Sequence, residues 1–229
     1  MRQRKLIDLD ERMADLADYI DRDGKQNKGR WSEMFSTKMV CEDAGSGKKN
    51  EGKEQGLLCL EIGCGKGKFI YEMAQEHPEN CYIGIEGQES VIVRAAEKLK
   101  REPLPNVYLV SSYVRDLGDF FEEGELDRIY LNFSDPWPKA RHAKRRLTYR
   151  DYLSAYMTAL RPGGRIEFKT DNEGLFDFTL GEIDCLGYEI CEMSRDMHGD
   201  GIGSVGFRTE YEEKFIAKGV KIKYVSIVK

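Results

Sequence analysis

Apolar positions along the chain alternate between strand-like runs and helical spacing from Leu57 onward. A run at 57–62 is followed by helical spacing to about Glu76, a second run at 81–86 and helical spacing at 90–100. Further strand-like runs lie at 107–110, 127–133, 164–169, 188–192 and 221–228. Because most of these runs are separated by segments of helix length, the pattern predicts an α/β fold with a doubly wound, mostly parallel sheet.

The residues before this alternation contain a helical pattern and a polar stretch. Apolar residues recur at helical spacing before Gly24 and predict a short amphipathic helix: they are Leu6, Leu9, Met13, Leu16 and Ile20. Residues 41–56 read CEDAGSGKKNEGKEQG and offer almost nothing to bury, so we expect a flexible linker. The predicted organisation is an N-terminal helical extension at 1–40, a linker at 41–56 and one domain at 57–229.

The region from 149 to 169 predicts a helix, a turn and a strand in succession. The helix is expected over Tyr149–Leu160, and the sequence RPGG at 161–164 is typical of a turn. The strand Arg165–Lys169 then rejoins the sheet.

Composition limits the class of protein. A chain of 229 residues is long enough to bury the core of a single-domain enzyme. Its formal net charge of −5 argues against a wholly basic surface, so any contact with nucleic acid must be local. From Lys139 to Arg150 there are six Lys or Arg and no acid. Two interpretations of this run stay open, a solvated charged face and an anion-binding patch.

The cysteines and histidines predict neither a metal centre nor a disulfide framework. The six cysteines include no CxxC pair, and the three histidines are scattered without the spacing of metal ligands. No apolar run reaches the roughly 18 residues that a membrane span needs. We therefore expect a soluble, cytoplasmic protein with no metal and no membrane partner.

An apolar strand runs into a glycine turn at Gly63, Gly65 and Gly67, where the backbone can approach a ligand closely. Glu61 precedes this turn and favours a cationic ligand such as S-adenosylmethionine, which carries an ammonium and a sulfonium. Glu86, at the end of the next strand, is placed to bind two ribose hydroxyls. An NAD-dependent dehydrogenase, whose usual spacing is GxGxxG rather than GxGxG, and a purely structural turn remain alternatives.

Asp135 and Trp137 follow an apolar strand in the run LNFSDPWPK at 131–139. The prolines cannot donate to a sheet, so the strand must end here and leave both side chains in a fixed loop. Active sites collect in such loops, although the Asp135 carboxylate could equally cap the N–H groups of a turn. The basic residues that follow the loop are Arg141, Lys144, Arg145 and Arg146.

With these motifs in order, the sequence resembles the bacterial single-subunit tRNA (guanine-N7)-methyltransferases over Leu57–Lys229. The resemblance is carried by LEIGCGKG at 60–67, IGIE at 83–86, NFSDPWPKARHAKRR at 132–146, FKTDN at 168–172 and TEYE at 209–212. It implies a Rossmann-like methyltransferase domain that uses S-adenosyl-L-methionine and releases S-adenosyl-L-homocysteine. It also implies tRNA as the partner and N7 of a guanine, at position 46 in the variable loop, as the methylated atom.

The resemblance also implies roles for individual residues. Glu61 and Glu86 would contact the cofactor beside the glycine turn of Gly63, Gly65 and Gly67, and Asp135 stands at the position of the catalytic acid. The target nucleotide would be bound by Lys139, Asp171, Thr209, Glu210, Tyr211 and Glu212. The RNA would be contacted by Arg141, Lys144, Arg145 and Arg146.

Tyr113 departs from the family pattern, and Thr209, Glu212 and Asp171 also fit ordinary structural roles. Family members usually carry Asp or Asn followed by Ala where this chain has Tyr113 and Val114, so we expect the Ser112 backbone or Tyr113 stacking to hold the adenine. Thr209 and Glu212 also match a helix-capping box, and both roles can coexist. Asp171, followed by an Asn after a strand, could belong to an ordinary turn.

The chemistry of guanine limits the mechanism. N7 carries a lone pair and no proton, so its attack on a sulfonium methyl needs no general base. We therefore expect Asp135 to orient the guanine through its N1 and N2 donors, or to hold the cofactor ammonium, and Trp137 to shape the pocket.

Other functions stay open at this point. The chain could be an S-adenosylmethionine-dependent methyltransferase for another RNA, a protein or a small molecule, or a non-catalytic RNA-binding protein on the same fold. The oligomeric state is expected to be a monomer or a homodimer.

Overall fold

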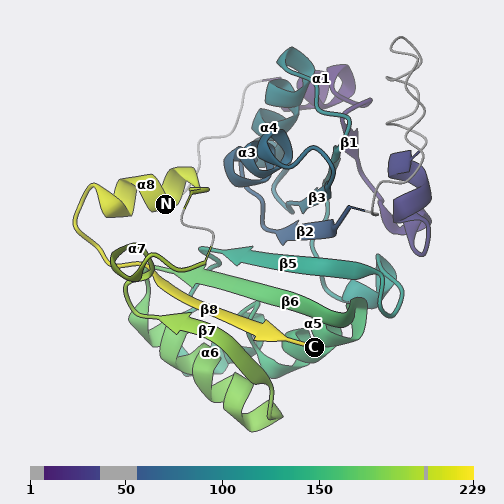
Figure 1. Cartoon of the computed structure of the whole chain (residues 1–229). Helices are drawn as coiled ribbons and strands as arrows, with labels where there is room; N and C mark the ends of the chain where they lie inside the picture. Colours follow the sequence, from purple (N-terminus) through teal and green to yellow (C-terminus); the bar gives the residue numbers. More distant parts are fainter. Residues whose placement is uncertain (1–7, 37–55, 204–205) are drawn as a thin grey trace.

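The computed structural model describes residues 8–36, 56–203 and 206–229. Its centre is one eight-stranded sheet with the strand order β1-β4-β3-β2-β5-β6-β8-β7 (Figure 1). In chain order the strands are β1 (Ile20–Asp21), β2 (Leu58–Ile62), β3 (Cys81–Ile85), β4 (Val107–Val110), β5 (Leu126–Asn132), β6 (Leu160–Thr170), β7 (Glu189–Ser194) and β8 (Lys223–Val228).

Among the described strands, the six neighbours from β1 to β6 in the sheet order pair in parallel, and β8 runs antiparallel to its neighbours β6 and β7. The predicted doubly wound, mostly parallel sheet is therefore confirmed. All five residues of β2 are buried, as expected for a central strand covered on both faces.

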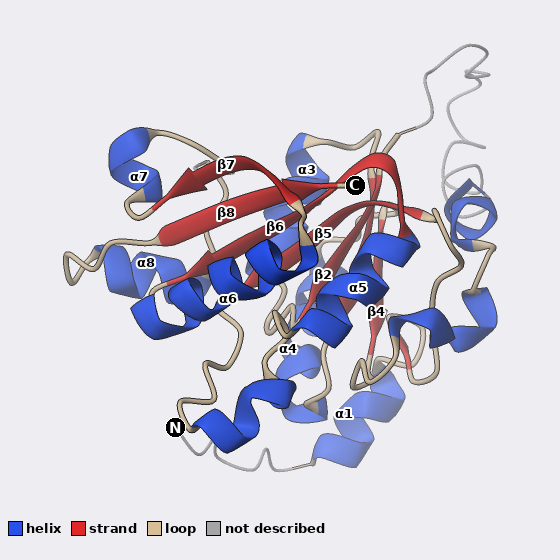
Figure 2. Cartoon of the chain, turned by 90° about the horizontal axis from the view of Figure 1, so that it is seen from below, coloured by secondary structure: helices blue, strands red, loops and turns tan. Residues whose placement is uncertain are grey.

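Helices cover both faces of the sheet. They include α1 (Leu9–Asp15), α3 (Lys68–Glu76), α4 (Glu89–Arg101), α5 (Arg150–Ala159), α6 (Glu173–Leu186), α7 (Met197–Asp200) and α8 (Glu210–Ile216), with short 3₁₀ helices η1 (Lys25–Asn27), η2 (Leu117–Asp119) and η3 (Ala140–Arg145). One apolar cluster joins α5 and α6 to the sheet, and a second joins α1, α3 and α4 to its other face. Figure 2 shows α5 and α6 lying along the same side of β5 and β6.

The N-terminal helix is shorter than predicted, and this prediction was wrong at its end. α1 ends at Asp15, and Ile20 belongs to strand β1, where it pairs with Leu109 of β4. A free sheet edge offers Ile20 both backbone partners and burial, and these outweigh its helical spacing. Leu6 and the predicted linker, apart from Gly56, lie outside the described residues.

The described residues before the linker pack on the sheet. Residues 31–36 are helical, and Trp31 and Phe35 are buried in the cluster that contains α5 and α6. Trp31 Nε1 donates to the Phe120 carbonyl at 2.9 Å, and its ring stacks on Phe121. This segment therefore contributes to the core, whereas the domain division made from the sequence stays a prediction.

β6 begins earlier than predicted. The strand starts at Leu160, which pairs with Leu126 of β5, and the expected turn at 161–164 is an irregularity within the strand, where the register with β5 shifts before Arg165 pairs with Arg128. The backbone there finds partners at the C-terminus, because Gly163 N donates to the Lys229 carbonyl and Lys229 N donates to the Gly164 carbonyl, both at 3.0 Å. Gly163 has a φ of 79°, as a turn glycine does.

The carboxyl ends of the parallel strands meet at one edge of the sheet. The glycine turn follows β2, Glu86 follows β3, Ser112 lies just beyond β4, and the loop with Asp135 follows β5. Segments far apart in sequence are thus brought together where ligands bind in folds of this class. Within the described ranges, no helix combines the length and the apolar character that a membrane crossing requires.

Candidate active site

The three glycines of the turn have different tasks. All three have a positive φ, of 76° at Gly63, 59° at Gly65 and 73° at Gly67. A Cβ at Gly63 or Gly65 would meet no atom within 4 Å, whereas one at Gly67 would lie 2.8 Å from Ala95 Cβ of α4. The first two glycines therefore leave the backbone open toward a ligand, and the third allows α3 and α4 to pack closely.

Glu61 is a buried carboxylate beside this turn, with only 2% of its surface exposed. Its Oε1 accepts a hydrogen bond from Asn132 Nδ2 at 2.8 Å, while Oε2 has no partner among the described residues. Burial raises the pKa of Glu61 to about 7, against the opposing effects of the Asn132 hydrogen bond and the Lys169 charge. A buried acceptor of this kind is stabilised by a cationic ligand.

Asn132, at the end of β5, is the second polar group of this corner. Its Nδ2 is used by Glu61, and its buried Oδ1 accepts nothing within the described part of the chain. The Glu61–Asn132 pair thus presents two unused acceptors to a donor-rich ligand.

Glu86 ties the glycine turn to the strand beside it. Its Oε2 accepts from Gly65 N at 3.2 Å and its Oε1 from Gln88 N at 2.8 Å. Burial raises the pKa of Glu86, the backbone N–H groups oppose this, and the nearby charge of Asp135 adds to the rise. The carboxylate is held in place, and each oxygen keeps a further lone pair for a ligand hydroxyl.

Two cavities open at this edge of the sheet. The glycine-turn cavity, of about 320 Å³, is lined by Glu61, Gly63 and Gly65 and by the start of α8. The Asp135 cavity, of about 700 Å³, is lined by Asp135 and Trp137 together with residues beyond β3 and β4. The residues that line both cavities are Gly63, Glu86, Gln88, Asn132 and Phe133. The two cavities therefore share a wall.

The loop after β5 has an unusual backbone. Phe133 and Trp137 have positive φ values of 53° and 39°, a conformation that side-chain-bearing residues rarely adopt. Arg146 holds the loop, because its Nε donates to the Pro136 carbonyl and its Nη2 to the Trp137 carbonyl, both at 3.0 Å. Asp135 lies between these restrained positions, exposed at the mouth of its cavity. Such strain is characteristic of functional loops.

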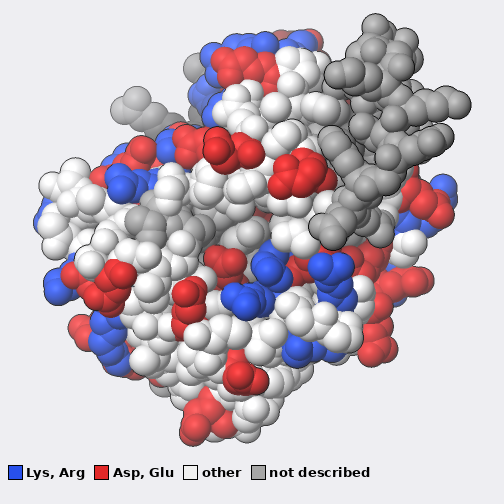
Figure 3. Space-filling view, viewed as in Figure 1, with Lys and Arg blue, Asp and Glu red and all other residues white. Residues whose placement is uncertain are grey.

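The structure separates the four predicted RNA-binding residues. Lys144 and Arg145 line the Asp135 cavity, and the Arg145 guanidinium lies 4.9 Å from the centre of the Trp137 ring. Arg141 is exposed outside both cavities. Arg146 is partly buried, donates two hydrogen bonds to carbonyls of the loop, and has its guanidinium over the ring of Phe178. Figure 3 shows basic and acidic side chains interspersed on one face of the molecule, with several basic ones gathered near its centre.

Tyr113 lies beside the wall formed by Glu86. Its ring is so close to Gly87 that an added Cβ there would be 2.3 Å from ring atoms. The side chain is 67% exposed and lines the Asp135 cavity together with Ser112. An exposed aromatic face is thus available at the end of β4 for a flat ligand.

Two of the residues predicted to bind the target nucleotide lie away from the cavities. Neither Lys139 nor Asp171 lines either one, and the Asp171 carbonyl accepts from Lys223 Nζ at 3.0 Å. Their predicted roles remain predictions. A third cavity, of about 710 Å³, lies at the β1 edge and contains none of the predicted site residues.

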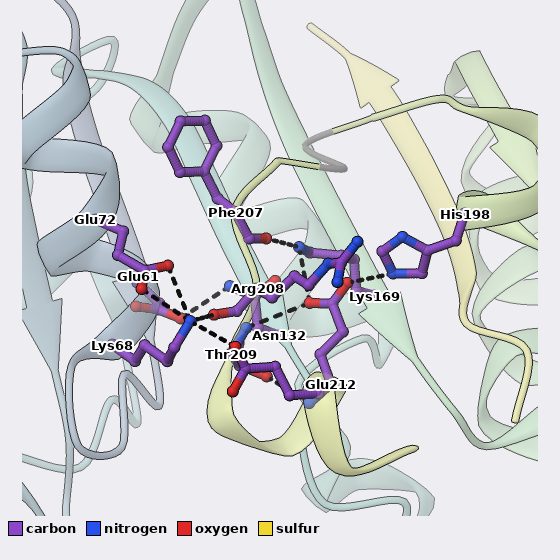
Figure 4. Close-up of polar contacts among 11 residues, drawn as sticks. Glu61, Lys68, Glu72, Asn132, Lys169, His198, Phe207, Arg208, Thr209 and Glu212 are labelled. Atoms are coloured by element: carbon purple, nitrogen blue, oxygen red, sulfur yellow. Dashed lines mark hydrogen bonds and ion pairs between the residues drawn. The ribbon is translucent and has the colours of Figure 1, made fainter. Parts of the chain in front are cut away.

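The segment that begins α8 divides into a cavity-lining part and a buried part. Thr209, Glu210 and Tyr211 line the glycine-turn cavity, whereas Glu212 is fully buried. Glu212 N donates to Thr209 Oγ1 at 3.0 Å and Glu212 Oε2 accepts from Thr209 N at 3.4 Å, so the capping box is present. Figure 4 shows Glu212 in contact with Lys169 and His198.

Three polar residues of this region were not singled out from the sequence: Asn132, Lys169 and His198. The first two lie inside the motifs quoted above, at the ends of β5 and β6, and this position at a strand end could have indicated that they belong to the site. His198 carries no such signal, because only folding brings α7 next to α8.

The described residues contain no group of three or more His, Cys, Asp or Glu side chains arranged to hold a metal ion. The residues at the strand ends instead offer carboxylates, open backbone and an aromatic face, which suit an organic cation with a sugar and a base.

Comparison with known proteins shows which protein family the chain is similar to. Residues 55–225 match the family model described as putative methyltransferase. The chain is 44% identical over 223 residues to a tRNA (guanine-N(7)-)-methyltransferase of Geobacillus thermodenitrificans, covering 97% of this chain and 94% of that protein. It is also 44% identical over 209 residues to the enzyme of the same name from Lactiplantibacillus plantarum, covering 91% of this chain and 90% of that protein.

Solved structures support the fold. An antibiotic-related methyltransferase matches with a TM-score of 0.56 at 21% identity, covering 76% of this chain and 88% of the other. The 16S rRNA methyltransferase KamB matches with a TM-score of 0.58 at 12% identity, covering 76% of this chain and 89% of the other. At these identities the likeness concerns the fold alone.

Proposed function

The chain belongs to the tRNA (guanine-N7)-methyltransferase family, and from that membership we propose that it transfers the methyl group of S-adenosylmethionine to N7 of a guanine in tRNA. The observation that carries the proposal is the wall shared by the two cavities, which joins the glycine turn to the loop of Asp135. We further propose position 46 of the variable loop as the target, on the resemblance of the motifs, and the cytoplasm as the place of action.

S-adenosylmethionine fits the residues around the glycine turn. The unpartnered Glu61 Oε2 suits the cationic amino group, and the open backbone at Gly63 and Gly65 allows close approach. Glu86 suits the ribose hydroxyls, and the Ser112 backbone with the exposed Tyr113 ring suits the adenine. When bound, the cofactor supplies an electrophilic methyl group on its sulfonium.

Asp135 is proposed to orient the guanine. Its carboxylate can accept from the N1–H and the N2 amino group of the base, and no general base is needed because N7 carries no proton. The negative charge also stabilises the cationic purine that forms. Holding N7 in line with the methyl group can lower the barrier by roughly 7–11 kcal/mol. Trp137, in the wall of the same cavity, limits where the base can lie.

The target guanine must leave its stack, at a cost of a few kcal/mol. Phosphate contacts from Lys144 and Arg145 beside the cavity can offset this cost. Lys139 and Arg141, both exposed and close to these two in the chain, are proposed to contact the RNA nearby. Thr209 to Tyr211 and Asp171 are proposed to contact the target nucleotide.

The proposal is tested by transfer of labelled methyl to unmodified tRNA, followed by nucleoside analysis. We expect label in 7-methylguanosine, and none when the guanine at position 46 is replaced by adenine. Asp135→Asn should lower kcat by about 10²-fold or more, because the amide removes the charge and half of the acceptor capacity. Asp119→Asn, an exposed aspartate that lines neither cavity, is the control.

Label in another nucleoside would keep the cofactor chemistry and reject the guanine-N7 target. Label in 7-methylguanosine of the tRNA with adenine at position 46 would reject the position alone. An Asp135→Asn enzyme with normal kcat would remove Asp135 from the mechanism.

A further inference from the structure

The family resemblance implies that Glu212 contacts the target nucleotide, but the structure buries this side chain. It has no exposed surface, and both of its carboxylate oxygens are already paired. Oε1 lies 2.8 Å from His198 Nε2, and Oε2 lies 3.3 Å from Lys169 Nζ and accepts from Thr209 N. Because the carboxylate is fully buried and lines neither cavity, Glu212 presents no oxygen to a ligand there.

Lys169 directs its contacts at the same segment. Its side chain is fully buried, and its Nζ donates to the Phe207 carbonyl at 3.2 Å as well as to Glu212. The ammonium also lies 4.8 Å from the centre of the Phe69 ring, over the start of α3. Burial lowers the pKa of Lys169, and the charge of Glu212 is the largest opposing influence. The ion pair therefore favours the charged form of the lysine inside the protein.

A buried ion pair is poor evidence for stability, because well-packed apolar residues often do as well. Breaking one by removing a single partner is costly, so the pair fixes its two elements relative to each other. Here the elements are β6, inside the sheet, and α8, whose first residues line the glycine-turn cavity. His198 adds a third element, α7, to the same carboxylate (Figure 4).

α8 needs such an anchor. A helix of seven residues is unstable alone, and its other ion pairs, Lys66–Glu210 and Lys68–Glu213, involve half-exposed glutamates and contribute little. We propose that Lys169 and His198 are positioning residues that act through Glu212 to hold Thr209, Glu210 and Tyr211 at the wall of the glycine-turn cavity. The proposal rests on the cofactor site of the proposed function, and assigns Glu212 to the anchor instead of to the nucleotide.

The test uses the full chain and S-adenosylhomocysteine as the probe, without tRNA. His198→Ala removes one partner of Glu212 and leaves the lysine in place. If α8 is docked in a smaller fraction of molecules, the apparent affinity for S-adenosylhomocysteine falls in proportion to the docked fraction. We expect calorimetry to give roughly tenfold weaker binding, the scale of one charge-assisted hydrogen bond. Amide hydrogen exchange in α8 should become faster.

Two comparisons separate positioning from general destabilisation. His198→Gln keeps an N–H donor and should restore most of the affinity, whereas Glu213→Gln breaks an exposed ion pair of the same helix and should stay within about twofold of wild type. Lys169→Met with Glu212→Gln removes both charges without leaving one unpaired. This variant should fold and melt near the wild-type temperature, yet show faster amide exchange in α8, a readout that the effect of the Lys169 charge on Glu61 does not move.

The proposal fails if His198→Ala binds S-adenosylhomocysteine as tightly as wild type with unchanged exchange in α8, or if the double variant keeps the wild-type exchange in α8. Neither readout involves RNA, so a wild-type protein that methylates no tRNA would refute the proposed function and leave this test intact.

Discussion

At the scale of single residues, the buried Glu61 carboxylate lowers the stability of the fold when it is charged, and the same charge suits the proposed cofactor site. Its pKa of about 7 lies above the ordinary value of 4.5, so between these values the native protein binds more protons than the unfolded chain. Stability contributed by this group therefore falls as the pH rises from about 4.5 to 7. The full penalty, of roughly 3 kcal/mol, is present above that range.

Glu61→Gln is expected to raise the melting temperature of the ligand-free protein at about pH 8 and to change it little near pH 4.5. The same substitution should weaken S-adenosylhomocysteine binding, because the amide cannot neutralise an ammonium. Thermal unfolding at the two pH values and calorimetry measure both effects. An equal shift in melting temperature at both pH values would show that the carboxylate charge is not the cause.

At the scale of elements, the loop after β5 is restrained by a residue that the sequence assigned to RNA. The planar guanidinium of Arg146 reaches two successive carbonyls of the loop, which a single ammonium cannot do in the same geometry. The positive φ values of Phe133 and Trp137 persist only if the surroundings over-determine them. Arg146 is such a restraint.

We therefore expect Arg146→Met to lower kcat by roughly tenfold or more while the salt dependence of tRNA binding stays unchanged. Arg145→Met, which removes a cation beside the Asp135 cavity, should reduce the salt dependence and affect kcat less. Methyl-transfer kinetics and binding at several salt concentrations separate the two variants. A lower salt slope for Arg146→Met would mean that this residue contacts phosphate.

At the scale of the whole molecule, tRNA binding must come from a local patch on an acidic protein. The net charge of −5 leaves long-range attraction weak, and the cations Lys144 and Arg145 lie beside the Asp135 cavity. Removing a single phosphate contact should reduce the slope of log K against log salt by about 0.7–0.9.

Replacing Lys144 and Arg145 together by Met is expected to reduce that slope by about 1.4–1.8. Replacing Arg94 and Arg101, two exposed cations on α4, makes the same change in net charge and serves as the control. Filter binding of tRNA between roughly 50 and 300 mM salt measures both slopes. Equal slopes for the two double variants would assign Lys144 and Arg145 to a solvated face.

The sequence by itself determined the sheet, most of its strands and the motifs at their ends. Alternating runs of apolar residues specify buried parallel strands, and Gly63, Glu86 and Asp135 follow such runs, so topology alone brings them to one edge. The capping box of α8 could also be predicted, because it depends on Thr209 and Glu212 three positions apart.

Only the tertiary structure decided which polar groups face a cavity and which are already bound to other groups of the protein. The same run of cations contains Arg145, which lines the cavity, and Arg146, which is bound to backbone carbonyls. Glu212 is buried because Lys169 and His198 reach it from β6 and α7. Local sequence specifies periodicity and turns, but burial and the partner of a charge depend on residues distant in the chain, and only the packed fold brings those together.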